Sequence, residues 1–369
     1  MFEKNLRHPA FKRPLGKPRV EIKVKGTPVP KWTSFRVESN GFSVADSFEV
    51  KLPWDVTEKP EQILLASTPT ASSLLVKETN IPVEIWLGFD VPGLPPVPSR
   101  RIMYGKMDIC RWNFGPDGEY VTLVGRNLAG QLIDTKTTEK YQNRTASQVA
   151  AEFFARHGLK PQVTATSTLI GTYLNNNHSN ITRETTQWDF LLYLAQQEGF
   201  VCRVVDDTGY FGPRSGIANL NAEPIPFTWG VNIDDLEIER GPQAARNIVV
   251  EVRSWHNGRR IVEKATTRNH VEEKYIQRFT IPGLTREQAQ KRARAILAEL
   301  SAQEFFGRLR TDWQPEISID RRIALYGVGQ GLSRVYYVNR VTVEGSLDGG
   351  TTAEIAFTST YLTDSGRYG

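Results

Sequence analysis

Hydrophobic and polar residues alternate over much of the first third of the chain, with the period of two that is typical of antiparallel strands. Asn40-Gly41 and Gly115-Pro-Asp-Gly118 supply turn signals between such segments. The alternation predicts strands at residues 20–24, 35–39, 82–87, 101–114 and 119–128. We therefore expect a first antiparallel β domain over residues 19–130.

The pattern then changes to the helical period of 3.6 residues. Apolar residues recur at i, i+3, i+4 and i+7 after a capping box formed by Thr186 and Asp189. These apolar residues are Trp188, Leu191, Leu192 and Ala195. Gly199 is placed to end the helix, and residues 201–205 with a turn at 206–209 predict a short hairpin after it.

A second amphipathic helix is predicted upstream of this one. Thr145 and Gln148 have the spacing of a capping box, and Gly158 supplies a stop. The apolar face of this helix consists of Val149, Ala150, Phe153 and Phe154. Together the two helices and the hairpin predict an α/β insert over residues 131–220.

Strand-like alternation returns in the last part of the chain, at residues 227–231, 248–252 and 317–357. It is interrupted by a helix that Thr285 and Gln288 cap. The apolar face of this helix consists of Ala289, Ala293, Ile296, Leu297 and Leu300. We expect a second β domain over residues 221–262 and 305–363, with a helical insert over 263–304.

Both β domains contain a strand, an Asp-Gly turn and another strand. Residues 104–109 and 120–124, around Asp117-Gly118, correspond to residues 337–342 and 353–357, around Asp348-Gly349. Asp-Gly turns are common enough for one such match to arise by chance. The pattern therefore favours an internal duplication without requiring it.

Length and charge narrow the class of protein. A chain of 369 residues exceeds one ordinary domain, and 46 basic residues against 41 acidic ones leave a net charge of +5. Residues 1–18 form a basic N-terminal arm without the apolar core of a secretory signal, so synthesis in a cytoplasm is expected. No apolar run is long enough to span a bilayer, and no membrane insertion is expected.

Two short motifs resemble catalytic or nucleotide-binding loops. Asp207-Thr-Gly209 and Asp364-Ser-Gly366 resemble the paired loops of aspartic proteases, but Asp207 falls in a hairpin turn and Asp364 lies five residues from the end of the sequence. Gly327-Val-Gly-Gln-Gly331 resembles a phosphate loop, but a strand follows where a helix is needed. We expect no catalytic residue and no cofactor.

Metal and nucleic-acid sites are not indicated either. The histidines have no ligand spacing, and neither Cys110 nor Cys202 belongs to a C-x-x-C pair, so both cysteines are expected to be reduced core residues. Arg259-Arg260 and Arg321-Arg322 lack interleaved aromatic residues and are interpreted as solvated charge. The histidines are His8, His157, His178, His256 and His270.

The helix beginning Trp188-Asp-Phe-Leu, its Glu198-Gly-Phe200 stop and the hairpin after it resemble the middle of phage tail baseplate hub proteins, the late control protein D family. The same fold opens the valine-glycine repeat proteins of type VI secretion. Residues 124–134 and 157–159 occur where that family has comparable segments. The resemblance extends over residues 101–240.

The resemblance implies a mainly β (α+β) fold with two similar antiparallel β-barrel tube domains, over 19–130 and over 221–262 with 305–363. It further implies a homotrimer that forms a pseudo-six-fold ring between a hexameric tail tube, or distal tail ring, and a trimeric spike made by another chain. Such a ring contacts other baseplate proteins and lets DNA pass with weak, non-specific contacts. It belongs to the virion, in the tail baseplate, and is assembled in the host cytoplasm.

Two other functions stay open from sequence. A tail-associated cell-wall hydrolase needs an acidic pair in a cleft. A carbohydrate-binding β module uses exposed aromatic side chains, for which 8 tryptophans are available.

Overall fold

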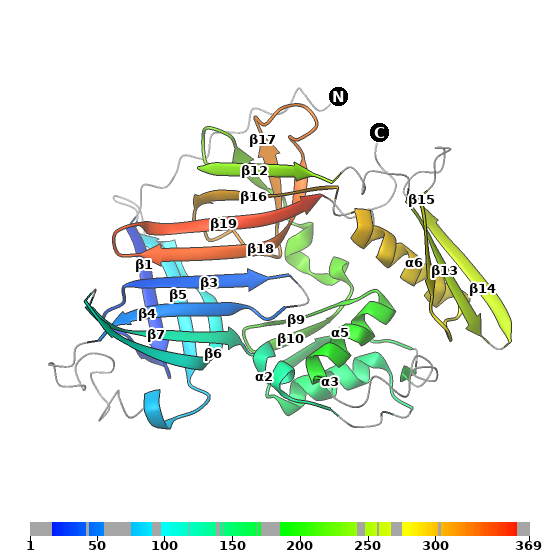
Figure 1. The fold of residues 1–369 in the computed structure, drawn as a ribbon, viewed down its shortest axis with the longest axis horizontal. Coiled ribbons are helices and arrows are strands. Elements are labelled where there is room, and N and C mark those ends of the chain that lie inside the picture. Colours follow the sequence, from blue (N-terminus) through cyan, green and yellow to red (C-terminus); the bar gives the residue numbers. More distant parts are fainter. Residues whose placement is uncertain are drawn as a thin grey trace.

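The computed structural model describes 13 ranges of the chain, and more than half of the described residues lie in strands (Figure 1). A 13-stranded sheet, here called the main sheet, lies beside two three-stranded sheets. The described residues are 17–41, 44–54, 75–90, 97–116, 118–137, 141, 143–167, 169–170, 185–241, 248–256, 258–266, 275–301 and 304–359. The predicted mainly β, antiparallel fold is confirmed. Residues 1–16 of the basic arm, Asp364, His8, His178 and His270 lie outside the described residues.

The main sheet contains strands from both ends of the chain. In spatial order these are β12 (Asp235–Arg240), β16 (Phe305–Asp312), β19 (Gly350–Ser359), β18 (Val335–Ser346), β3 (Ser34–Asn40), β4 (Ser47–Pro53), β7 (Gly118–Asn127), β6 (Val97–Gly115), β5 (Pro82–Asp90), β1 (Lys17–Val24) and β2 (Thr27–Pro28). Two further strands extend it, because β17 (Arg322–Tyr326) pairs with β18 and β11 (Ile225–Thr228) pairs with β17. The predicted hairpin around Gly115 and Gly118 joins β6 to β7.

The main sheet is built from one six-strand unit used twice. The first half is ordered β3-β4-β7-β6-β5-β1, and the second half is ordered β12-β16-β19-β18-β17-β11. When the strands of each half are numbered in chain order, strands at the same place in the two halves have the same number. One pairing differs, because β1 and β5 are antiparallel whereas β11 and β17 are parallel. This shared order supports the predicted duplication.

Irregularities at matching places fix the alignment of the two halves. The β6–β7 ladder shifts register between Met107 and Ile109, and the β18–β19 ladder shifts between Val338 and Arg340. When the two bulges are aligned, Met107 corresponds to Val338, and Lys106 therefore corresponds to Tyr337. The sequence pattern aligns Tyr104 with Tyr337, which is two residues out of register, because periodicity does not reveal a bulge.

Glycine and phenylalanine form equivalent cross-strand pairs in the two halves. Phe48 of β4 lies opposite Gly125 of β7, and Gly307 of β16 lies opposite Phe357 of β19. A Cβ atom on Gly125 would lie 2.6 Å from the Phe48 ring, and one on Gly307 would lie 2.8 Å from the Phe357 ring. Each phenylalanine therefore fills the space that its glycine leaves, which makes the two halves alike in packing as well as in order.

The two halves are joined edge to edge through β3 and β18, a pairing here called the seam. Their apolar faces form a single hydrophobic core that contains Val37 and Leu123 from the first half and Val341 and Ile355 from the second. Sequence periodicity predicted two similar β domains. It did not predict that they share one sheet and one core.

The α/β insert follows β7. It contains α2 (Ala129–Asp134), α3 (Ala146–Arg156), β8 (Lys160–Val163), α5 (Gln187–Glu198), β9 (Val201–Val205) and β10 (Thr208–Gly212). The capping box of Thr145 and Gln148 is complete, and Val149, Ala150, Phe153 and Phe154 are fully buried. Both predicted helices and the β9–β10 hairpin are present. The parallel pairing of β8 with β10 was not predicted.

Helix α5 has the predicted ends. The Thr186 hydroxyl accepts a hydrogen bond from the Asp189 backbone N–H at 3.0 Å. Gly199 adopts a left-handed φ of 69°, and the Phe200 N–H donates to the Ala195 carbonyl at 2.8 Å, which closes the last turn. Trp188 is 3% exposed, as expected of a core residue.

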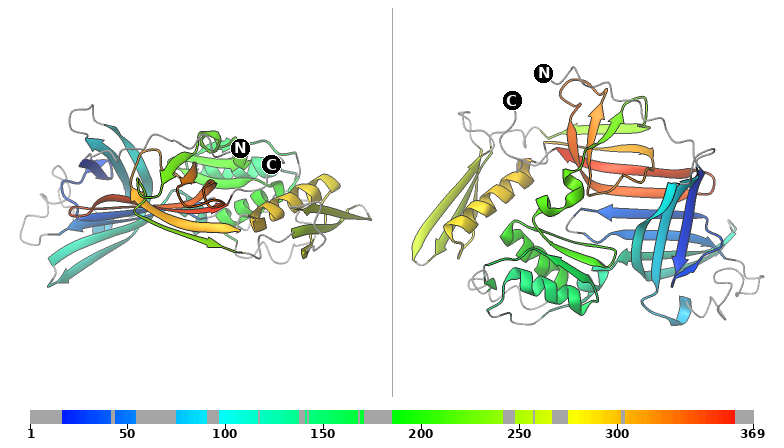
Figure 2. Two further views of the ribbon diagram at one scale, coloured as in Figure 1. Left: turned by 90° about the horizontal axis from the view of Figure 1, so that it is seen from above. Right: turned by 180° about the vertical axis from the view of Figure 1, so that it is seen from behind.

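The region after β12 differs from the predicted arrangement. β13 (Ile248–His256) and β14 (Arg259–Thr266), which the pattern assigned to the second β domain and the start of the helical insert, leave the main sheet. They form a separate sheet with β15 (Tyr275–Thr280), packed against α6 (Arg286–Ser301), and extend away from the main sheet (Figure 2). The reason is that β13 buries Ile248, Val250 and Val252 in the core to which Ala289 and Ala293 of α6 belong.

Candidate functional site

The Asp207-Thr-Gly209 motif forms part of a hairpin on the surface. Asp207 lies in the turn between β9 and β10, where Lys160 Nζ is 2.7 Å from its Oδ2. The hydrogen bond from Lys160 holds the pKa of this carboxyl below its usual range. A Cβ on Gly209 would lie 2.4 Å from the Phe154 ring, so the glycine is required where β10 packs on α3. These contacts account for the motif in structural terms.

The glycine-rich run at residues 327–331 connects β17 to β18. Gly327, Gly329 and Gly331 all have positive φ angles, between 76° and 94°. As the sequence indicated, a strand follows this loop, so the backbone lacks the helix N-terminus of a dinucleotide site.

The described histidines and cysteines are not gathered at one place. His157 follows α3, where its Nε2 lies 2.8 Å from Gln187 Oε1, and His256 ends β13. In the part of the chain that the structure describes, no three His, Cys, Asp or Glu residues are grouped to hold a metal ion. Cys202 is buried in β9, as expected, but Cys110 of β6 is only half-buried, and burial raises its pKa to about 11.

The arginine pairs have different environments. Arg321 and Arg322 donate to the carbonyl oxygens of Glu223, at 2.8 Å, and Ala222, at 3.2 Å. They tie the segment before β11 to the start of β17. Arg260 lies over the ring of Trp255, 6.0 Å from its centroid, because the β13–β14 hairpin brings the two residues together.

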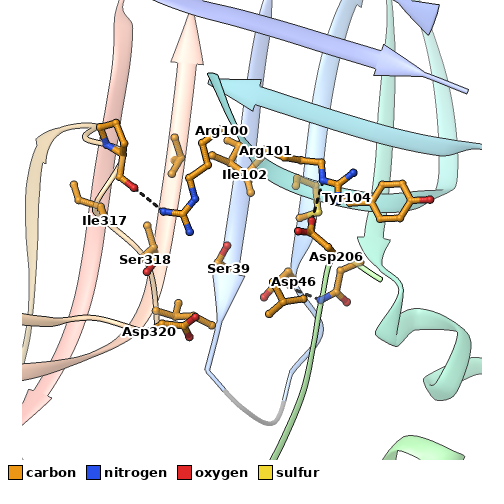
Figure 3. A pocket seen from close by; sticks show the side chains of 18 of the residues that line it. Ser39, Asp46, Arg100, Arg101, Ile102, Tyr104, Asp206, Ile317, Ser318 and Asp320 are labelled. Carbon is orange, nitrogen blue, oxygen red and sulfur yellow. Dashed lines mark hydrogen bonds and ion pairs between the residues drawn. The ribbon is translucent and has the colours of Figure 1, made fainter. Parts of the chain in front are cut away.

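A cavity of about 380 Å³ lies where the two halves of the main sheet meet the α/β insert (Figure 3). Arg100 reaches across it and donates to the carbonyl of Pro315 at 2.7 Å. Arg101 pairs with Asp206, in the β9–β10 turn, at 3.0 Å. Its guanidinium also lies 4.7 Å from the ring centroid of Tyr104. This cavity is here called the central cavity.

The aspartates of the central cavity are all engaged by donors. Asp320 binds the guanidinium of Arg203 through both oxygens, one of them at 2.9 Å. Asp46 accepts the Asn40 backbone N–H at 2.7 Å and Asn127 Nδ2 at 3.2 Å. Burial raises the pKa of Asp46 to about 7. The arrangement stabilises a junction between three parts of the chain.

Over the strands β12, β16, β19, β18, β3, β4, β7 and the second half of β6, the face of the main sheet that points away from its core is polar and nearly balanced in charge. It is here called the polar face. Ion pairs cross its strands, with Arg36 Nη1 2.5 Å from Glu344 and Arg308 Nε 2.7 Å from Glu237. Its acidic residues are Glu38, Glu49, Asp108, Asp235, Glu237, Glu239, Asp312, Glu344 and Glu354. Its basic residues are Arg36, Lys51, Lys106, Arg111, Arg126, Arg308, Arg310 and Arg340. Two hollows, of about 830 and 290 Å³, lie over it.

Solved structures of tail proteins share this fold. The tail protein from Neisseria meningitidis MC58 superposes with a TM-score of 0.67 at 18% identity, covering 93% of this chain and 97% of that one. The 43 kDa tail protein of prophage MuSo2 from Shewanella oneidensis gives 0.65 at 13% identity, covering 92% and 98%. A type VI secretion component of E. coli, described as similar to the T4 tail proteins gp27 and gp5, gives 0.56 at 10% identity, covering 94% and 78%.

No curated protein matches the chain in sequence. The family model described as the Alg8 N-terminal domain matches residues 117–345, which is more than half of the 369 residues. The match begins at the β6–β7 turn, includes both inserted regions and ends within β18. The expected membership of the late control protein D family stays a prediction. By this match, the chain belongs to the Alg8 N-terminal domain family.

Proposed function

We propose that this chain is the structural baseplate hub of a phage tail, which forms a trimeric ring between the hexameric tail tube and a trimeric spike. The observation that carries the proposal is the six-strand unit that occurs twice in the main sheet. Three copies of such a chain offer six similar units, which matches a six-fold partner at one end while keeping three-fold symmetry overall. The shared fold of tail proteins supports this assignment.

The two ends of the main sheet suit these two symmetries. The β6–β7 and β18–β19 turns lie at the same end, away from the inserts (Figure 1). This end presents similar hairpins from both halves and is suited to a tube ring or distal tail ring. The opposite end carries the α/β insert after β7 and the β13–β15 region after β12, which are unlike each other. Each of these regions occurs once per chain, so a trimer presents three of each. Contact with a three-fold spike and other baseplate proteins requires this arrangement.

The polar face is suited to line the channel of the ring. A strongly basic lining would hold DNA by releasing the counterions of its phosphates. The cross-strand pairs of Arg36 with Glu344 and of Arg308 with Glu237 neutralise their charges locally. DNA would therefore pass with weak, non-specific contacts, in a virion baseplate assembled in the host cytoplasm.

Reconstruction of the assembled baseplate tests the proposal. We expect three copies of the chain per tail, arranged around a central channel. Six copies, or one copy, would contradict it.

None of the described helices is long and apolar enough to cross a membrane.

The hydrolase and carbohydrate-binding alternatives have separate tests. Asp46, Asp206 and Asp320 all line the central cavity, so the purified chain is assayed for muralytic activity. Trp229 and Trp255 are each 51% exposed, so a glycan array is the second assay. Under the hub proposal both assays are negative.

A further inference from the structure

We propose that neighbouring copies in the ring join by strand addition, with β12 of one copy pairing antiparallel to residues 109–115 of β6 in the next. This inference rests on the proposed function and specifies the contact between copies. The duplication supports it, because the corresponding contact already occurs within one chain, at the seam.

At the seam, a long strand of one half receives a strand of the other. β18 has β19 along one edge, while its other edge pairs first with β17 and then with β3. The β3 contact runs from Arg340 opposite Asn40 to Ser346 opposite Ser34.

The counterparts of these two strands have free edges in the described structure. β6 corresponds to β18; it pairs with β5 as far as Lys106, and beyond Met107 only its β7 edge is paired among the described strands. β12 corresponds to β3 and pairs with β16 alone. Each copy therefore offers both partners of a second seam, one at each end of the duplicated sheet.

The exposed side chains agree with a missing partner at this edge. On β6, Phe114 is 63% exposed and Ile109 is 47% exposed. Apolar residues on a free strand edge favour unwanted pairing, so they are expected to be covered by a partner. Leu236 and Ile238 of β12 are only partly buried against the core.

The duplication also fixes the register. The matching bulges place Trp112 where Val343 lies. Phe48 and Gly307 occupy equivalent positions in the two halves. Val37 lies opposite Phe48 and Ile238 lies opposite Gly307, so Ile238 corresponds to Val37. Because Val343 lies opposite Val37 at the seam, Trp112 is assigned opposite Ile238 of the next copy. The same register sets Cys110 opposite Arg240, Arg111 opposite Glu239 and Phe114 opposite Leu236.

This register is chemically consistent on both faces of the strands. On the core face it pairs Trp112 with Ile238 and Phe114 with Leu236, which are all apolar, and it sets Cys110 opposite Arg240 at the end of β12. On the polar face it sets Arg111 opposite Glu239, so opposite charges meet as Arg36 and Glu344 do at the seam. A slip by one residue would turn every side chain to the wrong face.

The native cysteine allows a direct test. Opposed side chains in antiparallel strands have Cβ atoms about 4.5–5.5 Å apart, close to the range that a disulfide needs. In the full chain with Arg240→Cys, mild oxidation of the assembled ring should link Cys110 of one copy to the new cysteine of the next. Non-reducing gels should then show dimers and trimers. Glu239→Cys is the matched control, because its side chain points to the other face, and Cys110→Ser in the Arg240→Cys background should abolish the link.

The outcomes separate this inference from the proposed function. Three copies per baseplate with no Arg240→Cys link, or with an equal link from Glu239→Cys, would overturn the strand register and leave the trimer standing. One or six copies per baseplate would overturn both. Selective linking through Arg240→Cys in a trimer supports both.

Charge exchange provides a measurement without a disulfide. Arg111→Glu and Glu239→Arg should each weaken association about fivefold by setting like charges opposite each other. The double variant should restore the wild-type association. Equal, additive weakening in the double variant would show that the two residues do not meet.

Discussion

The carboxyl group of Asp46 lies where the first half of the main sheet meets the α/β insert, and burial raises its pKa to about 7. A carboxyl whose pKa is higher in the folded state binds more protons there than in the unfolded state. Its contribution to stability is therefore present at low pH and is lost as the pH rises towards 7.

We predict that the free energy of unfolding falls by about 1 kcal/mol per pH unit between pH 5 and 7 through this group. Chemical denaturation at several pH values measures it. In Asp46→Asn the slope should be smaller over the same range. An unchanged slope in that variant would assign the pH dependence to other groups.

Asp207 is the second residue with a specific expectation. It lies on the surface and pairs with Lys160, so Asp207→Asn, alone or with Asp364→Asn, should leave assembly and the unfolding midpoint unchanged. The purified wild-type chain should show no proteolytic activity. Proteolysis that disappears in the double variant would show the motif to be catalytic.

At the scale of elements, α5 supports the insert through its apolar side. Trp188, Leu191 and Leu194 belong to the core that the insert shares with α6 and the β13–β15 sheet. Trp188→Ala should reduce the free energy of unfolding by about 3–5 kcal/mol, as for other buried aromatic residues. Leu192→Ala, at a partly buried position of the same helix, is the control and should cost less. A loss below about 1 kcal/mol for Trp188→Ala, measured by chemical denaturation, would contradict the burial of this face.

At the scale of the whole molecule, the charge balance of the polar face has a consequence for DNA. Glu49→Lys and Glu354→Lys should each make assembled rings bind duplex DNA more tightly and with a steeper salt dependence, because each added cation near a phosphate releases counterions. Glu287→Lys, on the exposed side of α6, changes the charge without altering this face and should have a smaller effect. Equal effects at both places would argue against a channel lined by the polar face.

The candidate site was predictable from sequence only in part. The motifs at Asp207 and at residues 327–331 were interpreted correctly as hairpin and loop, because the neighbouring residues already indicated strands. The central cavity gave no signal, since Asp46, Arg101, Arg203 and Asp320 lie far apart along the chain and meet only when three parts of the fold pack together.

The sequence by itself determined the features that short-range interactions control. Helix ends depend on residues within one turn, which is why Thr145 with Gln148, Thr186 with Asp189, and Gly199 were sufficient to place them. Strand alternation determined which side chains face a core.

Only the tertiary structure decided which strands are neighbours. Alternation assigns a face to each residue but does not name the strand beside it, so the seam between β3 and β18 and the departure of β13 and β14 to a separate sheet were not predictable. The free edges of β6 and β12 became visible for the same reason, since an edge is defined by the pairing of every other strand in the sheet.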